Sequence, residues 1–296
     1  MAISIRRLSH ALGAEISGID ISQPLDEKSY AEIHSAFLEH SVLLFRGQAL
    51  TRAQHIAFSR WFGDLDKQDA HRVNHMDPTY PEIYFVTNRP KQDGSSTDDK
   101  FNHQVRTTSY QGADWHSDRS FTLTPSKATL LRGIELPEIG GDTMFANCYR
   151  AYDTLSEGTK KLIDGLYGAH IQEGRSLDHS SPDKLAESKR RNRTAQPLVR
   201  VHPETGRKAL YLGYRIRHII GMTPEESAPL LQMLHEHAAR PQLVYRHVWR
   251  KDDLVIWDNC CTMHIALGDF DRARQVRHME KTCVLGTPSG YAIPLQ

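Results

Sequence analysis

Short apolar segments with strand character recur along this chain of 296 residues, and turn residues separate most of them. They are 41–45, 82–87, 115–123, 128–134, 143–146, 198–202, 209–212, 243–249, 254–257 and 276–285. No apolar run reaches the roughly 18 residues that a transmembrane helix needs. Many short strands with only a few helices favour two packed β-sheets over a bundle or a doubly wound sheet. We therefore predict a mainly β protein with flanking helices.

Four segments carry helix patterns: 26–40, 51–62, 152–166 and 223–239. In the second, Thr51 and Gln54 have the spacing of a capping box and Gly63 ends the helix. The fourth begins with Thr223 and Pro224, a preferred cap followed by a preferred first-turn residue. No repeat or change of composition divides the chain, so we expect a single domain over 1–296, with mobile segments near 88–113 and 173–196.

Charge and cysteine content exclude several classes of protein. The formal net charge is +1, so bulk charge does not favour nucleic acid or an acidic membrane surface. None of the four cysteines forms a C-x-x-C pair, which argues against a zinc ribbon or a redox dithiol. The first residues lack the pattern of a secretory signal. We expect a cytoplasmic protein with reduced thiols.

The residues with the clearest chemistry are His116 and Asp118, followed far downstream by His264. On a strand, positions i and i+2 face the same side, so the first two can bind one ion together. Two histidines and one carboxylate leave sites open on Fe(II) for a 2-oxo acid and for dioxygen. A His-x-Asp pair alone is weak evidence in a chain with 17 histidines. A zinc hydrolase using the same residues, or a non-catalytic jelly-roll binding protein, stays open at this point.

Other motifs occur in a fixed order around these residues. They are LGAEISGID at 12–20, LLFRGQ at 43–48, HIAFSRWFG at 55–63, WHSD at 115–118, GGDT at 140–143, LVRVHP at 198–203 and WDN at 257–259. Together they resemble the family of taurine dioxygenase and aryloxyacetate (2,4-dichlorophenoxyacetate) dioxygenase, which are Fe(II)/2-oxoglutarate-dependent oxygenases. The resemblance runs over nearly the whole chain.

The resemblance implies a double-stranded β-helix, or jelly-roll, core and an oligomer of two or more chains. It implies that His116, Asp118 and His264 bind Fe(II). It also implies that Thr143 and Arg277 bind the distal carboxylate of the cosubstrate 2-oxoglutarate, since a guanidinium fork and a hydroxyl both suit a carboxylate. Arg272 and Arg274 compete for the role of Arg277, which we prefer because it lies in the strand pattern 276–285.

The expected reaction is hydroxylation of a C–H bond of a small organic substrate with release of succinate and CO2. Halogenating relatives lack the carboxylate ligand, so Asp118 favours hydroxylation. Relative to the taurine enzymes of this family, the second arginine, four residues after the first, is replaced here by Lys281, a point charge instead of a fork. An anionic substrate is still expected: an aryloxyalkanoate, a sulfonate, an alkyl sulfate or another acid. Candidate substrate-binding residues are Lys281, His71, Gln111 and Phe121.

Overall fold

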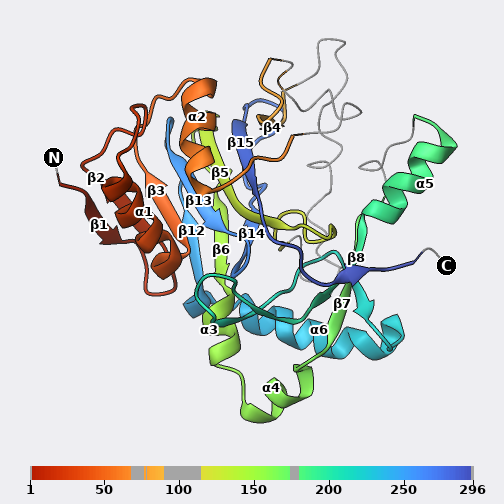
Figure 1. The fold of residues 1–296 in the computed structure, drawn as a ribbon. Coiled ribbons are helices and arrows are strands. Elements are labelled where there is room, and N and C mark those ends of the chain that lie inside the picture. Colours follow the sequence, from red (N-terminus) through yellow and green to blue (C-terminus); the bar gives the residue numbers. More distant parts are fainter. Residues whose placement is uncertain (1, 68–76, 78, 90–114, 174–179, 295–296) are drawn as a thin grey trace.

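The computed structural model describes residues 2–67, 77, 79–89, 115–173 and 180–294. The core contains a seven-stranded sheet and a three-stranded sheet. Figure 1 shows the strands of both sheets side by side in the centre of the protein. The seven are, in spatial order, β1 (Ser4–Arg7), β2 (Ala14–Ser17), β3 (Val42–Phe45), β13 (Leu254–Asp258), β5 (Ser126–Glu135), β15 (His278–Leu285) and β4 (Tyr84–Thr87). The three are β12 (Val244–His247), β6 (Thr143–Asn147) and β14 (Thr262–Ala266). All pairs in these two sheets are antiparallel except β2 with β3.

The two sheets pack face to face and form the predicted jelly-roll core. Phe145 of β6 lies in one apolar cluster with Leu131, Val255, Trp257 and Met279 of the larger sheet. All five side chains are buried. Strand residues that alternate in direction can fill the space between two sheets in this way. The mainly β architecture expected from the sequence is therefore confirmed.

Helices cover the outer faces of both sheets. The helices α1 (Glu27–His40) and α2 (Arg52–Ser59) bury Ile33, Phe37 and Phe58 against the larger sheet. On the side of the smaller sheet, α3 (Cys148–Asp153) and α6 (Pro224–Ala238) share another apolar cluster with β14. The capping box of α2 is present as predicted, and a short 3-10 helix, η1 (Arg60–Phe62), continues α2 up to Gly63.

Two smaller sheets lie beside the core. The four-stranded sheet has the order β11 (Ile216–Ile219), β7 (Tyr167–Ile171), β8 (Arg193–Pro197) and β16 (Tyr291–Ala292). The strands β10 (Lys208–Leu210) and β9 (Val199–Val201) form a two-stranded sheet. Within the expected mobile segment 173–196, the structure has α5 (Pro182–Arg191) and β8, whereas 90–113 lies outside the described residues. The mobility of both segments stays a prediction.

Two local expectations were wrong. The predicted helix over 152–166 is two helices, α3 and α4 (Glu157–Ile163), because the Ser156 side chain accepts a hydrogen bond from the Thr159 amide and starts a new helix. The predicted strand over 115–123 is not regular: only His116 forms a bridge, and Arg119, at φ 56°, turns the chain.

None of the helices in the described part of the chain combines the length and the apolar character needed to cross a membrane.

Acid should destabilise this fold through three buried histidines. Burial lowers the pKa of His55 and His170 to about 3 and that of His235 to about 4. In the unfolded chain a histidine titrates near about 6.5, so the unfolded state binds more protons below that pH. Stability is therefore complete above the unfolded pKa and falls as the pH drops towards the folded values, by up to about 1.4 kcal/mol per pH unit for each residue.

Urea unfolding at about pH 7 and about pH 5 measures this loss. We expect His170→Gln to flatten the pH dependence of the unfolding free energy, with the exposed His10→Gln as the matched control. An unfolding free energy that is equally pH-dependent in both variants would contradict the assignment.

Candidate metal centre

The three predicted metal ligands come together where the irregular segment 115–118 meets β14. The amide of His116 donates to the carbonyl of His264 at 3.0 Å, and the amide of His264 donates back at 2.8 Å. This single bridge fixes the two histidines side by side, with ring centroids 4.2 Å apart. Asp118 follows before the chain turns at Arg119.

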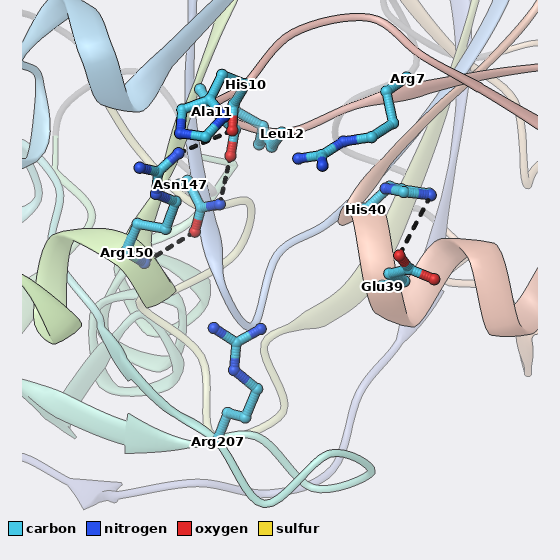
Figure 2. Close-up of a pocket in the computed structure, with 9 residues that line it drawn as sticks. All are labelled: Arg7, His10, Ala11, Leu12, Glu39, His40, Asn147, Arg150 and Arg207. Atoms are coloured by element: carbon cyan, nitrogen blue, oxygen red, sulfur yellow. Dashed lines mark hydrogen bonds and ion pairs between the residues drawn. The ribbon is translucent and has the colours of Figure 1, made fainter.

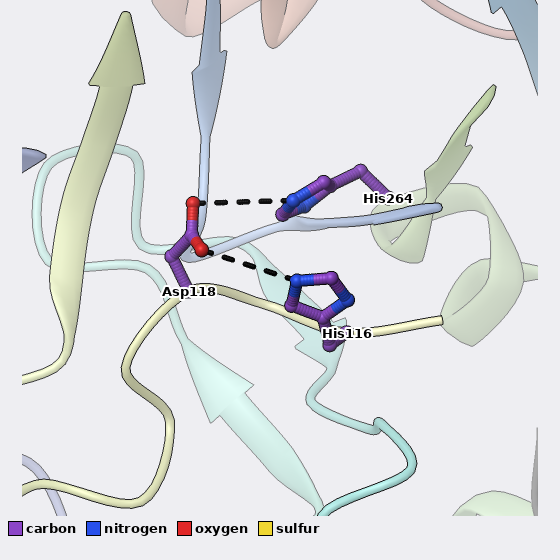
Figure 3. Close-up of side chains that lie close together, drawn as sticks. All are labelled: His116, Asp118 and His264. Atoms are coloured by element: carbon purple, nitrogen blue, oxygen red, sulfur yellow. Dashed lines mark ion pairs between the residues drawn. The ribbon is translucent and has the colours of Figure 1, made fainter. Parts of the chain in front are cut away.

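The donor atoms of these residues converge on one point (Figure 3). The Nε2 atom of His116 lies 3.9 Å from Oδ1 of Asp118, and Nε2 of His264 lies 3.9 Å from Oδ2. All three donor atoms fall within 4.8 Å of one another. Asp118 and His264 are buried and His116 is partly exposed. Two imidazoles and one carboxylate in a single cluster fit a divalent transition metal with open coordination sites.

Electrostatics keep these ligands in the states that bind a cation. Burial by itself raises the pKa of Asp118, but the charges of Lys281, His264 and His116 outweigh it and hold this pKa well below its usual range. Burial lowers the pKa of His264 to about 4, assisted by Lys281 and opposed by Asp118. At neutral pH the carboxylate is ionised and the His264 imidazole is neutral, as metal binding requires.

A buried polar network orients the carboxylate. The Thr129 hydroxyl donates to Oδ2 of Asp118 at 2.7 Å, and Nδ2 of Asn259 donates to that hydroxyl oxygen at 3.0 Å. The Oδ1 atom of Asn259 accepts from the amide of Asp118 at 3.0 Å. The register of β13 on β5 places Trp257 opposite Thr129, which brings Asn259 to the site. Sequence analysis missed Thr129; it noted Asn259 only within the motif at 257–259.

Replacing Thr129 by valine should weaken metal binding by roughly 10-fold to 100-fold, the usual loss when an outer-shell partner is removed. The change keeps the side-chain volume but removes the hydroxyl that holds Oδ2 of Asp118. Titration of the metal-free protein with Mn(II) measures the effect. Thr129→Ser retains the hydroxyl and is the matched control, so equal affinities of the two variants would contradict an orienting role.

Thr143 and Arg277, the predicted 2-oxoglutarate residues, lie together. Nη2 of Arg277 is 3.4 Å from the Thr143 hydroxyl, and its Nε donates to the Gly141 carbonyl at 2.8 Å. Nη1 is buried and has no acceptor among the described residues. Burial lowers the pKa of Arg277 only to about 10, so the side chain stays cationic at neutral pH. A buried cation with an unused donor fits an anionic ligand.

The local backbone explains this position and corrects one expectation. Gly141 has φ 71°, and a β-carbon there would lie 3.1 Å from Cδ of Arg277, so the glycine leaves room for the guanidinium. Arg277 does not belong to the strand, because β15 begins at His278. Of the two competing arginines, Arg274 is exposed and pairs with Asp271 at 3.7 Å. Burial is the main cause of the lowered pKa of Arg277, and the charge of Asp142 opposes it. Arg272 lies close enough to Arg277 to lower this pKa further.

The predicted substrate residues are only partly described. Lys281, on β15, places its Nζ 3.2 Å from Oδ1 of Asp118, so this cation contacts the carboxylate ligand directly. Phe121 is buried, 6% exposed. His71 and Gln111 lie outside the described residues.

Two other polar groupings have structural explanations. His202, Asp258 and Cys261 could in principle hold a metal. However, Nε2 of His202 already bonds Asp258 at 2.9 Å, its Nδ1 accepts from two backbone amides, and burial raises the pKa of Cys261 well above its usual value. Figure 2 shows a surface pocket where Asn147 and Arg150 bond the backbone of Ala11 and His10, which ties the N-terminal segment to α3.

Comparison with known proteins gives matches over nearly the whole chain. Residues 4–283 match the family model described as "Taurine catabolism dioxygenase TauD, TfdA family". An "Alkylsulfatase" of Acinetobacter baylyi is 35% identical, covering 94% of this chain and 84% of that relative. An "Alpha-ketoglutarate-dependent 2,4-dichlorophenoxyacetate dioxygenase" of a Burkholderia species is 34% identical, covering 89% of each chain. An "(S)-phenoxypropionate/alpha-ketoglutarate-dioxygenase" of Sphingobium herbicidovorans is 31% identical, covering 90% and 89%.

Solved structures agree with these matches. A putative alpha-ketoglutarate-dependent taurine dioxygenase from Burkholderia xenovorans superposes with a TM-score of 0.80 at 33% identity, covering 100% of this chain and 96% of the other. A structure described as AAD-2 in complex with Mn(II) and N-oxalylglycine gives a TM-score of 0.80 at 32% identity, covering 98% and 99%.

Proposed function

From the premise that this chain belongs to the taurine catabolism dioxygenase TauD, TfdA family, we propose that His116, Asp118 and His264 bind Fe(II) and that the enzyme hydroxylates a small organic anion. The protein is a 2-oxoglutarate-dependent dioxygenase, as are its relatives. The zinc-hydrolase and binding-protein alternatives have no support from these relatives. The observation that carries the proposal is the convergence of the three donor atoms within 4.8 Å.

The proposed cosubstrate site consists of one cation, Arg277, and the neighbouring hydroxyl of Thr143. Arg277 and Thr143 bind the distal carboxylate of 2-oxoglutarate, and Nη1 of Arg277 is the donor that this carboxylate engages. Bound Fe(II) supplies the activation of dioxygen, with the oxidation of 2-oxoglutarate to succinate and CO2 providing two electrons. One oxygen atom enters succinate and the other enters the substrate as a hydroxyl group. The chain's own side chains hold the reactants in place and exclude water.

The substrate class is narrowed by charge and by the relatives. The names of similar proteins include an alkylsulfatase, phenoxypropionate and 2,4-dichlorophenoxyacetate dioxygenases and a sulfate ester dioxygenase. We propose a sulfate ester, a sulfonate or an aryloxyalkanoate here, with Lys281, Phe121, His71 and Gln111 at the substrate site. Hydroxylation of a carbon that bears an ester or ether oxygen gives a product that collapses to a carbonyl compound and releases sulfate or a phenol.

The test is succinate formation. The protein is loaded anaerobically with Fe(II), then given ascorbate, 2-oxoglutarate, air and one of octyl sulfate, 2-phenoxypropionate or 2,4-dichlorophenoxyacetate. We expect succinate with each turnover of the preferred anion, and less with the matched neutral alcohol or amide. No succinate above the protein-free background, with any compound or without one, would overturn the proposal. An assembly of two or more chains stays a prediction that light scattering can check.

A further inference from the structure

Arg215 lies beside the metal centre, in a segment packed directly against His116. The amide of Tyr214 donates to the Trp115 carbonyl at 2.9 Å, and the Tyr214 ring lies 5.6 Å from the His116 ring. A β-carbon at Gly213 would come within 3.2 Å of Cα of His116. The segment 213–215 therefore forms a wall of the site. Sequence analysis gave no indication of it, because these residues carry none of the motifs.

Two aromatic rings hold the Arg215 guanidinium. Its central carbon lies 4.5 Å from the centroid of the Tyr214 ring and 5.1 Å from that of Phe121. Its Nε donates to Oε1 of Gln172 at 2.8 Å, which fixes the direction of the fork. The two rings and the hydrogen bond from Nε fix the guanidinium, so its Nη atoms are oriented in advance to bind two oxygen atoms of an oxyanion.

One donor of this fork, Nη1, is not used within the described part of the chain. Nη1 of Arg215 is buried and has no hydrogen-bond partner among the described residues, and no acidic side chain of that part of the protein pairs with it. The neighbouring Arg217, in contrast, pairs with Glu173 at 2.9 Å. Leaving the buried Nη1 donor of a partly buried cation without an acceptor is costly, so an anionic ligand that supplies the acceptor gains a charge-assisted hydrogen bond.

Lys281 is less available for this purpose. Its Nζ is 3.2 Å from Oδ1 of Asp118 and its charge already compensates that carboxylate. Arg215 packs on Tyr214, whose ring lies against His116, so both cations lie beside the same centre. Of the two, Arg215 is the one without an anionic partner in the described structure.

We propose that Arg215 binds the oxyanion group of the substrate, a carboxylate or a sulfate ester, and that it sets the preference of this enzyme for anionic over neutral substrates. This inference rests on the proposed function, because it names the residue that binds the substrate anion in the same site. Phe121, predicted as a substrate residue, then acts by supporting Arg215 from one side. Lys281 acts mainly on Asp118.

The experiment compares Arg215→Gln and Arg215→Lys with Arg217→Gln, a matched control two residues away whose guanidinium already has a partner. Steady-state assays use 2-phenoxypropionate against its neutral amide and octyl sulfate against octanol. Calorimetry measures binding of the same anions to full-length protein loaded with Mn(II) and N-oxalylglycine. The KM for 2-oxoglutarate and the uncoupled formation of succinate are recorded for every variant.

For Arg215→Gln we expect the KM or Kd for the anion to rise about 10-fold to 100-fold, the range for losing a hydrogen bond to a charged group. The neutral compounds should change little, so the ratio of kcat/KM for anion over neutral compound falls. Arg215→Lys should lie in between, and Arg217→Gln should match the unchanged protein. The KM for 2-oxoglutarate should stay constant in all of them.

The outcomes separate this inference from the proposed function. Turnover of the anions with an unchanged KM in Arg215→Gln, or in Arg215→Lys if the glutamine variant does not fold, would overturn the role of Arg215 and leave the proposed function intact. If the wild-type protein neither turns over nor binds any of the anions, both the role of Arg215 and the proposed function are overturned. If anion binding weakens in Lys281→Met but not in Arg215→Gln, Lys281 and not Arg215 binds the oxyanion group of the substrate.

Discussion

Replacing Asp118 by alanine should abolish coupled turnover, with a loss of at least about 1000-fold, well beyond the roughly 10-fold to 100-fold expected for an outer-shell change. The carboxylate is the one anionic donor of the three-residue cluster, and it is buried beside Lys281. Its removal leaves two histidines beside the cation Lys281, whose charge is then unbalanced and opposes the binding of a divalent metal. We expect the variant to lose stoichiometric metal as well as activity.

Succinate release and metal content by atomic absorption measure the two effects together. Asp164→Ala is the control, because that carboxylate is 67% exposed and pairs with Lys208 on the surface. Circular dichroism checks that the Asp118 variant is folded. Metal content and turnover that match the control would remove Asp118 from the ligand set.

Replacing Arg277 by glutamine should raise the KM for 2-oxoglutarate by about 100-fold, because truncating one member of a buried charge pair costs roughly 2–5 kcal/mol. Arg277 is 2% exposed, and its Nη1 has no acceptor in the described part of the protein. The loss should appear in the KM for the cosubstrate, while the affinity for Mn(II) in its absence stays close to that of the unchanged protein.

Arg274→Gln is the matched control, since that side chain is 87% exposed and bonds Asp271. An Arg277→Gln variant with the wild-type KM for 2-oxoglutarate would contradict the assignment, and Arg272 would then be the residue to replace. Thr143→Val should produce a smaller rise in the same constant, because it removes a neutral donor instead of a charge.

Much of the local structure could be predicted because its causes are local. The Asp26 cap of α1, the capping box of α2 and the Thr223 cap of α6 all act within three residues. Where the local pattern was ambiguous, prediction failed. Residues 115–123 alternate like a strand, but the left-handed Arg119 turns the chain and only His116 pairs with β14. The apolar content of that segment reflects burial near the site, not strand pairing.

The sequence by itself determined the family and the jelly-roll class, and it predicted the three metal ligands and the cosubstrate pair Thr143 and Arg277. His116, Asp118 and Thr143 lie in motifs that can be recognised from their neighbours along the chain, whereas His264 and Arg277 follow from the resemblance of the whole chain to the family. Only the tertiary structure decided which groups surround them. Thr129, Lys281 and Arg215 come from distant segments, and Lys281 is 163 residues away from the carboxylate that it contacts. Such contacts depend on strand register and on how sheets pack, and no short-range pattern encodes them.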